Sequence, residues 1–426
     1  NGGSLALGAA ERLAANSILT VQGGTFDSSA YANTVGALIL TSGIVAGAGI
    51  LTAGTYSLSG GVVAGNLGLG TANVTGAVSL TGTTSANTLN INSGGILTLG
   101  ASNRIGDATA LNLNAGQLAL GTYSDTVATF TLSNAARLSG TGALTAATYA
   151  LQGGTVDANL GAGVATVSTG VTLLNGSLDA LAVGINSGSL VLGASNVLNS
   201  AAIITLSAGT LNSTSYSNTV AEVNMSGGII TGTGLLTAGT YGLSGGVVAG
   251  VLGEGTANIT GAVSLTGTMA PTTLNIAAGG ALTLGSANRL GDASAVVVNG
   301  GQLLLNGNDN VASLTLLNSG LLTGSGTLSA ATYALQGGTV AANLGAGVAT
   351  VTGASTQLGG LLSALTVNVN GGNLLLAGSN RFAASAVVSV SSGTLDTATF
   401  DTTIGVLNLG GGMITGMGLL TAGTYG

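Results

Sequence analysis

Two pairs of aspartates have the spacing at which this chain could carry out acid–base chemistry. The stretch of chain between Asp107 and Asp125 is almost equal in length to the stretch between Asp292 and Asp309. If the chain coils with a period of that length, neighbouring coils would bring the carboxylates of a pair to roughly 5 Å, the separation found in retaining glycosidases. Against this hypothesis, all four stand in Gly-, Asn- and Ser-rich segments, where Asp commonly forms turns. His and Lys are absent as bases. We therefore predict no catalytic residues and no enzymatic activity.

Arginines recur at one position of an internal repeat. They are Arg12, Arg104, Arg289 and Arg381, and Val197 takes the remaining copy. One interpretation is a recurring ligand contact. The interpretation we favour is a backbone corner at which each arginine forms a local ion pair, for example with Asp107 or Asp292, or caps a carbonyl. Copies five coils apart would be separated by roughly 24 Å, so they cannot converge on one small ligand.

Tyrosines recur in the same way, and no residue pattern indicates a metal or a cofactor. The tyrosines are Tyr56, Tyr149, Tyr241, Tyr333 and Tyr425. They could form a face on which sugars stack, but packing at a corner of each coil is the favoured interpretation. Cys is absent, which removes thiolate ligands. The Gly- and Asp-rich nonapeptide of calcium-binding β-rolls is also missing. We therefore predict neither a metal site nor a cofactor.

The composition narrows the class of protein. Gly is 77 of 426 residues but Pro occurs once, so a collagen helix is excluded. Hydrophobic residues make up 46% of the chain, enough to bury a core, so disorder is not expected. Only 4% of residues are charged, and the formal net charge is −7. With no basic stripe, nucleic acid is an unlikely partner.

The elements that hold these residues follow from a repeat. The hexapeptide at residues 51–56 (LTAGTY) returns, with its first residue at Leu144, Leu236, Leu328 and Leu420, after about 92 residues each time, and such a fixed period is typical of a solenoid. We interpret the chain as one continuous β-solenoid and as a piece of a longer repetitive protein. Odd and even modules alternate, so the larger repeating unit is about 184 residues. The modules are 1–50 (partial), 51–143, 144–235, 236–327, 328–419 and 420–426, the start of the next.

Within a module, short runs of alternating polarity flank Gly-rich corners. Leu89, Ile91, Leu97 and Leu99 are predicted to point inward, and polar residues such as Asn90 outward. Strands this short become stable when each pairs with its equivalent one coil away. Five coils per module give about 18 residues per coil and about 23 coils. At about 4.8 Å per coil the rod would be on the order of 110 Å long. The sequence thus predicts a single parallel β-helix.

Longer segments resemble a known family. Residues 97–107 (LTLGASNRIGD), followed by 110–120 and 124–132, are similar to the passenger-associated repeat of autotransporters. Residues 282–292 (LTLGSANRLGD) with 299–305 (NGGQLLL) are closer still. The resemblance implies a right-handed β-helical passenger, or a similar large exoprotein, exported across a Gram-negative outer membrane to the cell surface. The usual right-handed crossover of parallel strands agrees with that handedness.

These observations give three hypotheses of function. The first is a structural, surface-exposed fibre or stalk. The second is an adhesin that binds glycans, partner cells or itself through a lateral face. The third and most remote is a polysaccharide-degrading β-helix enzyme. Because the surface is almost uncharged, we expect self-association or filament assembly. We expect contact with the outer membrane only through a barrel or anchor outside these 426 residues.

Overall fold

A computed structural model describes residues 2–426 and shows a parallel β-solenoid. The described residues form 44 strands and no helix. Successive turns lie about 18 residues apart, and there are about 23 of them, which confirms the predicted fold class and period. Individual turns vary in length. Asn73 and Asn90 face each other across one turn and are 17 residues apart, whereas Asn90 and Asn112, across the next, are 22 residues apart. Because helix is absent from the described range, that range offers no helix that could span a membrane.

The chain forms two compact units, Asn1–Thr219 and Val220–Gly426. The strands of the first unit are β1 (Ser4–Ala6), β2 (Ile18–Val21), β3 (Thr25–Asp27), β4 (Asn33–Leu40), β5 (Ile44–Ala46), β6 (Ile50–Val63), β7 (Asn66–Leu67), β8 (Thr71–Leu80), β9 (Thr83–Thr84), β10 (Thr88–Ile91), β11 (Ile96–Leu99), β12 (Ala110–Asn114), β13 (Gln117–Gly121), β14 (Asp125–Gly140), β15 (Ala143–Val156), β16 (Asn159–Leu160), β17 (Val164–Val167), β18 (Val171–Leu174), β19 (Ala182–Ile185), β20 (Ser189–Leu192), β21 (Ile203–Leu206) and β22 (Thr210–Asn212).

The remaining strands, from the boundary between the two units onward, follow the same arrangement as those of the first unit. They are β23 (Asn218–Met225), β24 (Ile229–Thr231), β25 (Leu235–Val248), β26 (Val251–Leu252), β27 (Thr256–Leu265), β28 (Thr268–Met269), β29 (Thr273–Ile276), β30 (Ala281–Leu284), β31 (Ala295–Asn299), β32 (Gln302–Leu305), β33 (Asp309–Gly324), β34 (Thr327–Val340), β35 (Asn343–Leu344), β36 (Val348–Val351), β37 (Thr356–Leu358), β38 (Thr366–Val369), β39 (Asn373–Leu376), β40 (Val387–Val390), β41 (Thr394–Asp396), β42 (Thr402–Leu409), β43 (Met413–Thr415) and β44 (Leu420–Tyr425).

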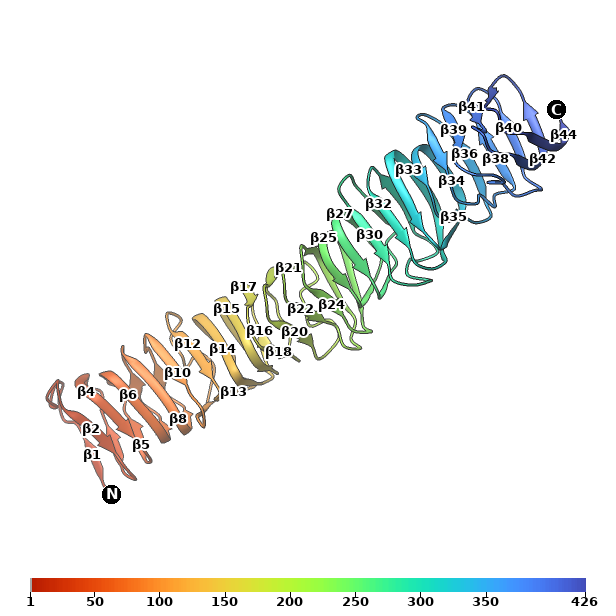
Figure 1. Ribbon diagram of the computed structural model, residues 1–426. Coiled ribbons are helices and arrows are strands. Elements are labelled where there is room, and N and C mark those ends of the chain that lie inside the picture. The colour runs from red at the N-terminus through yellow and green to blue at the C-terminus, as the bar shows by residue number, and fades with distance from the viewer. Residues whose placement is uncertain (1) are drawn as a thin grey trace. The chain divides into compact units, whose positions relative to one another are not determined.

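In the first unit the strands stack in columns, each pairing with the equivalent strand one turn away (Figure 1). One column contains β8, β10, β12 and the first half of β14, and a second contains β11, β13 and the second half of β14. A third column is built from very short strands such as β7 and β9. The longest strands turn a corner: β15 pairs with β17 through residues 148–151 and with β18 through residues 154–156.

The core runs through the inside of the columns. Leu89, Ile91, Leu97 and Leu99 are at most 3% exposed, as the alternation predicts. Because successive side chains of a strand point to opposite faces, every second residue adds to a continuous aliphatic interior. In the second unit β27, β29, β31 and β33 form the equivalent column with the same alternation of burial. Most polar side chains of the interior form hydrogen bonds that compensate their burial, whereas the buried hydroxyl groups of Thr356 and Thr402 have no partner among the described residues.

Candidate functional site

The recurring tyrosines are part of this interior. Tyr56, Tyr149, Tyr241 and Tyr333 are at most 1% exposed, whereas Tyr425 in the last strand is 62% exposed. The four buried rings therefore cannot present a face to a sugar, and packing inside the coil, the favoured prediction, is what the structure shows. Burial raises their pKa values, that of Tyr241 to about 12, against smaller opposing effects of backbone hydrogen bonds.

The Tyr149 hydroxyl closes a corner of the backbone. It accepts a hydrogen bond from the Ala146 amide at 2.9 Å and faces the carbonyl oxygens of Leu144 and Gly161 at 3.2 and 3.0 Å. Gly163 passes directly over the ring with φ +154°, and a Cβ atom there would lie 2.7 Å from Cε2 of Tyr149. The Tyr149 ring thus requires a glycine in the next turn, and Gly70 and Gly347 lie similarly close to the rings of Tyr56 and Tyr333.

The candidate catalytic aspartates are placed in unequal surroundings. Asp125 and Asp309 are 2% and 1% exposed, whereas Asp107 and Asp292 are exposed. The Asp125 carboxylate accepts hydrogen bonds from the amides of Arg104 at 2.7 Å, Ile105 at 3.2 Å and Thr126 at 3.0 Å. Burial raises the pKa of Asp125, and the nearby charge of Asp107 adds to this effect, although the backbone hydrogen bonds oppose it.

The same position is polar in the other modules, and it caps the same corner in all of them except the last, where the Thr402 hydroxyl group has no hydrogen-bond partner within residues 2–426. The Asn33 side chain accepts from the Arg12 amide at 2.9 Å, and Asn218 accepts from the Val197 amide at 2.9 Å. Asp309 repeats the contacts of Asp125 on the Arg289 amide, and the pKa of its carboxyl group is raised for the same reason, desolvation. An amide replaces the carboxylate without loss of the contact. The buried aspartates therefore act as backbone acceptors.

Two of the four recurring arginines cap carbonyl groups, one of the two roles predicted for them, whereas Nε of Arg381 is buried without a hydrogen-bond partner in the described part of the chain. Arg104 donates to the carbonyl oxygens of Ser102 at 3.0 Å and Thr81 at 3.3 Å, and Arg289 donates to that of Gly267 at 3.2 Å. The other predicted role, an ion pair with Asp107 or Asp292, is not formed. Within residues 2–426 the structure has one ion pair, and it lies elsewhere.

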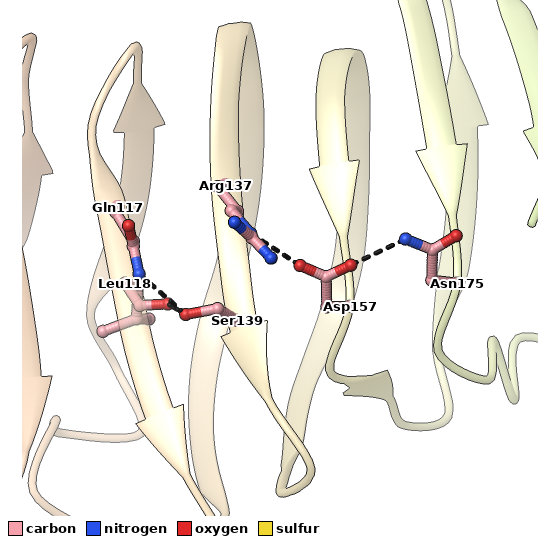
Figure 2. Close-up of polar contacts among 6 residues, drawn as sticks. All are labelled: Gln117, Leu118, Arg137, Ser139, Asp157 and Asn175. Atoms are coloured by element: carbon pink, nitrogen blue, oxygen red, sulfur yellow. Dashed lines mark hydrogen bonds and ion pairs between the residues drawn. The ribbon is translucent and has the colours of Figure 1, made fainter.

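That ion pair joins the fifth arginine to the next turn. Nε of Arg137 donates to Oδ2 of Asp157 at 2.6 Å, and Oδ1 of Asp157 accepts from Nδ2 of Asn175 at 2.7 Å (Figure 2). One turn earlier, Nε2 of Gln117 donates to Oγ of Ser139 at 3.0 Å. The Arg137 side chain is 58% exposed. We call Gln117, Arg137, Ser139, Asp157 and Asn175 the polar ladder; it crosses four turns of one outer face. Sequence reasoning did not single out this group.

An open hollow of about 470 Å³ adjoins the polar ladder. On the outer face, Thr155 of β15 pairs with Arg137 of β14 in the previous turn and with Leu173 of β18 in the next turn. The polar ladder and the hollow therefore share a face. Gln152 and Val171 line the hollow with Thr155 and Leu173, and Val171 is 60% exposed. Three glycines line the hollow, and β14 bulges here: the register between β14 and β15 shifts between Ser133 and Ala136. The remaining lining residues are Asn134, Ala135, Gly153, Gly154 and Gly170.

The polar ladder is not repeated in the second unit. There, Gln302 pairs with Leu321 as Gln117 pairs with Arg137. The positions equivalent to Ser139, Asp157 and Asn175 hold Thr323, Ala341 and Gly359. Val171 and Leu173 are likewise replaced by Ser355 and Gln357. A feature that both units need for folding would be kept in both, so this face is the part of the first unit that most resembles a specific site.

Comparisons with known proteins leave the chain without an assigned family: no family model, no curated protein and no solved structure matches it. Among the described residues, no group of three or more His, Cys, Asp or Glu side chains is arranged to hold a metal ion. The chemistry available at the candidate site is therefore that of hydrogen-bond donors and acceptors beside an aliphatic surface.

Proposed function

We propose that this protein is a structural fibre or stalk exposed at the cell surface. The observation that carries the proposal is that its recurring polar residues form hydrogen bonds to the backbone. Tyr149 and Asp125, like Tyr333 and Asp309 in the second unit, hold one turn of backbone to the next. Repeated polar groups that stabilise the stacking of one turn on the next suit a protein whose role is to form a long solenoid.

The β-solenoid fold and the motif at residues 97–107 support an autotransporter passenger or a similar exoprotein as the specific form of this role. Such a protein would be extracellular, on the outer face of a Gram-negative outer membrane. The near absence of charge also favours lateral association of stalks, since little repulsion opposes it. The proposed role includes no enzymatic reaction.

Small-angle X-ray scattering of the purified chain tests the stalk. One uninterrupted stack of about 23 turns at roughly 4.8 Å each predicts a maximum dimension on the order of 110 Å. A much shorter maximum dimension would contradict a rod. Location is tested on intact cells of the source organism with proteinase K, since five arginines and no lysine offer trypsin few cleavage sites. Full protection of the protein on intact cells would rule out surface exposure.

A second function, adhesion through a lateral face, is favoured by one observation. The polar ladder is exposed, adjoins an open hollow on the same face and is not repeated in the second unit. A stalk alone does not require such a departure from the repeat. The two functions are compatible, because a stalk can carry a binding face along its length.

A further inference from the structure

We propose that the polar ladder and the adjoining hollow form a binding site for a neutral oligosaccharide. The site would comprise Arg137, Asp157 and Asn175 on the ladder, with Gln152 and Val171 in the hollow. This inference does not depend on the structural role; it names a ligand for the second proposed function, adhesion through a lateral face, and rests on that function. Three properties of the face point to this ligand: its hydrogen-bonding groups, its aliphatic surface and its charge.

The hydrogen-bonding groups suit a ligand that both donates and accepts. Arg137 uses Nε for Asp157, which leaves its two terminal nitrogens directed to an exposed surface. Within residues 2–426 the structure gives the side chains of Gln152 and Thr155 no hydrogen bond. Amide, hydroxyl and guanidinium groups together match the vicinal hydroxyls of a sugar, each of which is both a donor and an acceptor.

Hydrogen bonds hold the side chains of Arg137, Asp157 and Asn175 in place before a ligand binds. Two hydrogen bonds, of 2.6 and 2.7 Å, fix the Asp157 carboxylate between its neighbours (Figure 2). Groups held in place lose little conformational freedom on binding, so less of the interaction energy is cancelled. The aliphatic part of the site is also prepared: Val171 is 60% exposed and lies with Leu173 along the hollow. The C–H face of a sugar ring can pack on such a surface.

Charge decides between neutral and ionised ligands. Arg137 and Asp157 neutralise each other, so the ladder carries no net charge. The whole chain has a formal net charge of −7 and only five basic side chains. An acidic polysaccharide would meet repulsion with a single compensated arginine to offset it. A cationic ligand would find one carboxylate that is already paired. A neutral oligosaccharide is the occupant that this face fits.

Binding can be tested with a panel of neutral gluco-, manno-, galacto- and xylo-oligosaccharides, each six or seven sugars long. Isothermal titration calorimetry of the full chain at millimolar sugar would measure affinity, with hexagalacturonate as the anionic comparison. We expect at least one neutral member to bind and hexagalacturonate to bind at least tenfold more weakly. Failure of the whole neutral panel, or tighter binding of hexagalacturonate, would overturn the proposal.

The second unit supplies variants for assigning the site. The double change Arg137→Leu with Asp157→Ala installs the residues found at 321 and 341, which the same backbone register accepts. We expect it to lower affinity at least tenfold with an unchanged circular dichroism spectrum and melting temperature. Undiminished affinity would show that sugar binds elsewhere.

Two further variants separate the site from general effects on the solenoid. Thr155→Val removes a hydroxyl group in the hollow, and Thr339→Val removes its equivalent in the second unit. We expect a loss of affinity of about threefold or more for Thr155→Val and none for Thr339→Val. Equal effects of the two changes would contradict a site confined to the first unit.

Discussion

At the scale of single residues, buried polar groups mark where turns of the solenoid are held together. Asp125 is almost fully buried, yet three backbone amides point at its carboxylate. Burial disfavours the charged form, whereas hydrogen bonds from amides favour it. The net effect is a raised pKa, so burial is the larger of the two. Asn33 and Asn218 fill the same position without a charge.

This balance predicts that the stability of the fold depends on pH and that Asp125→Asn weakens this dependence. Because the pKa of Asp125 is higher in the folded chain than its usual 3.8, the folded state binds more protons above that pH. The free energy of unfolding should therefore fall as pH rises from about 3.8 through the raised pKa, and then level off. Asp125→Asn should remove part of this fall, and Asp309→Asn a similar part. Urea denaturation between pH 3 and 7 measures it; a double variant with the wild-type pH dependence would contradict the assignment.

Substituting alanine at the same position separates hydrogen bonding from charge. Asp125→Ala leaves the amides of Arg104, Ile105 and Thr126 without their acceptor. A buried donor without a partner costs about 1–3 kcal/mol. We expect Asp125→Ala to be less stable than Asp125→Asn at every pH by about that amount, as measured by urea denaturation. Equal stabilities would show that the amides find another acceptor.

Tyrosine hydroxyl groups give a second prediction at this scale. Tyr149→Phe keeps the ring but leaves the Ala146 amide without its 2.9 Å acceptor in a buried corner. We expect the free energy of unfolding to fall by about 1–3 kcal/mol. The control is Tyr123→Phe, since Tyr123 is 37% exposed. A comparable loss in both variants would mean that the hydroxyl contact at the corner is not what stabilises it.

At the scale of elements, a turn can pack closely on the tyrosine of the preceding strand only where the turn contains glycine. The turn that follows β15 returns over the Tyr149 ring, and only a residue without a side chain fits there. A Cβ atom at Gly163 would overlap the Ala146 carbonyl oxygen and lie 2.7 Å from Cε2 of Tyr149, and its φ is +154°. Gly70 and Gly347 stand in the same relation to Tyr56 and Tyr333, each with a Cβ position 2.9 Å from Cε2 of the ring, and a Cβ atom at Gly255 would overlap the Ala238 carbonyl oxygen.

Gly163→Ala should therefore be strongly destabilising, by about 2 kcal/mol or more, because the methyl group forces either the ring or the turn to move. Gly184→Ala is the matched control: it lies in β19, and its Cβ atom would come no closer than 3.7 Å to the nearest atom. We expect the control to be neutral or slightly stabilising, since alanine restricts the unfolded chain. Thermal unfolding of both variants measures the difference, and similar melting temperatures would contradict the tyrosine–glycine packing.

Much of the fold could be predicted at this scale, and the candidate site could not. The alternation at Leu89, Ile91, Leu97 and Leu99 predicts which face is inside, because successive side chains of any strand point to opposite faces. Lateral neighbours are different: a turn of 17 residues is followed by one of 22 residues, so partners across turns cannot be assigned by counting. The ion pair of Arg137 spans 20 residues and is visible only in the folded chain. Its one sequence signal is that Arg137 alone among the five arginines falls outside the repeat position.

At the scale of the whole molecule, the modules are equivalent, so a stretch between two equivalent positions should be removable without disturbing the fold. Tyr56 pairs with Ala72 as Tyr241 pairs with Ala257. In a solenoid each turn contacts its neighbours only, so stability is close to a sum over turns and the interfaces between them. Removing a stretch that begins and ends at equivalent positions should therefore leave every remaining turn with a suitable neighbour. Removing any other length should not.

A deletion of residues 57–241 tests this inference, because it joins Tyr56 to Gly242 and preserves the order of strands at the junction. We expect the shortened chain to keep the circular dichroism per residue of the parent. Its urea m-value should fall to roughly 0.6 of the parent value, since m follows the surface exposed on unfolding. The control is a deletion of residues 57–232, which is about half a turn out of register. Its inward aliphatic residues would face solvent near the junction, so we expect loss of ordered strand signal or aggregation. If both deletions behaved alike, the position of the turns would not depend on the repeat, and the equivalence of modules on which the site comparison rests would fail.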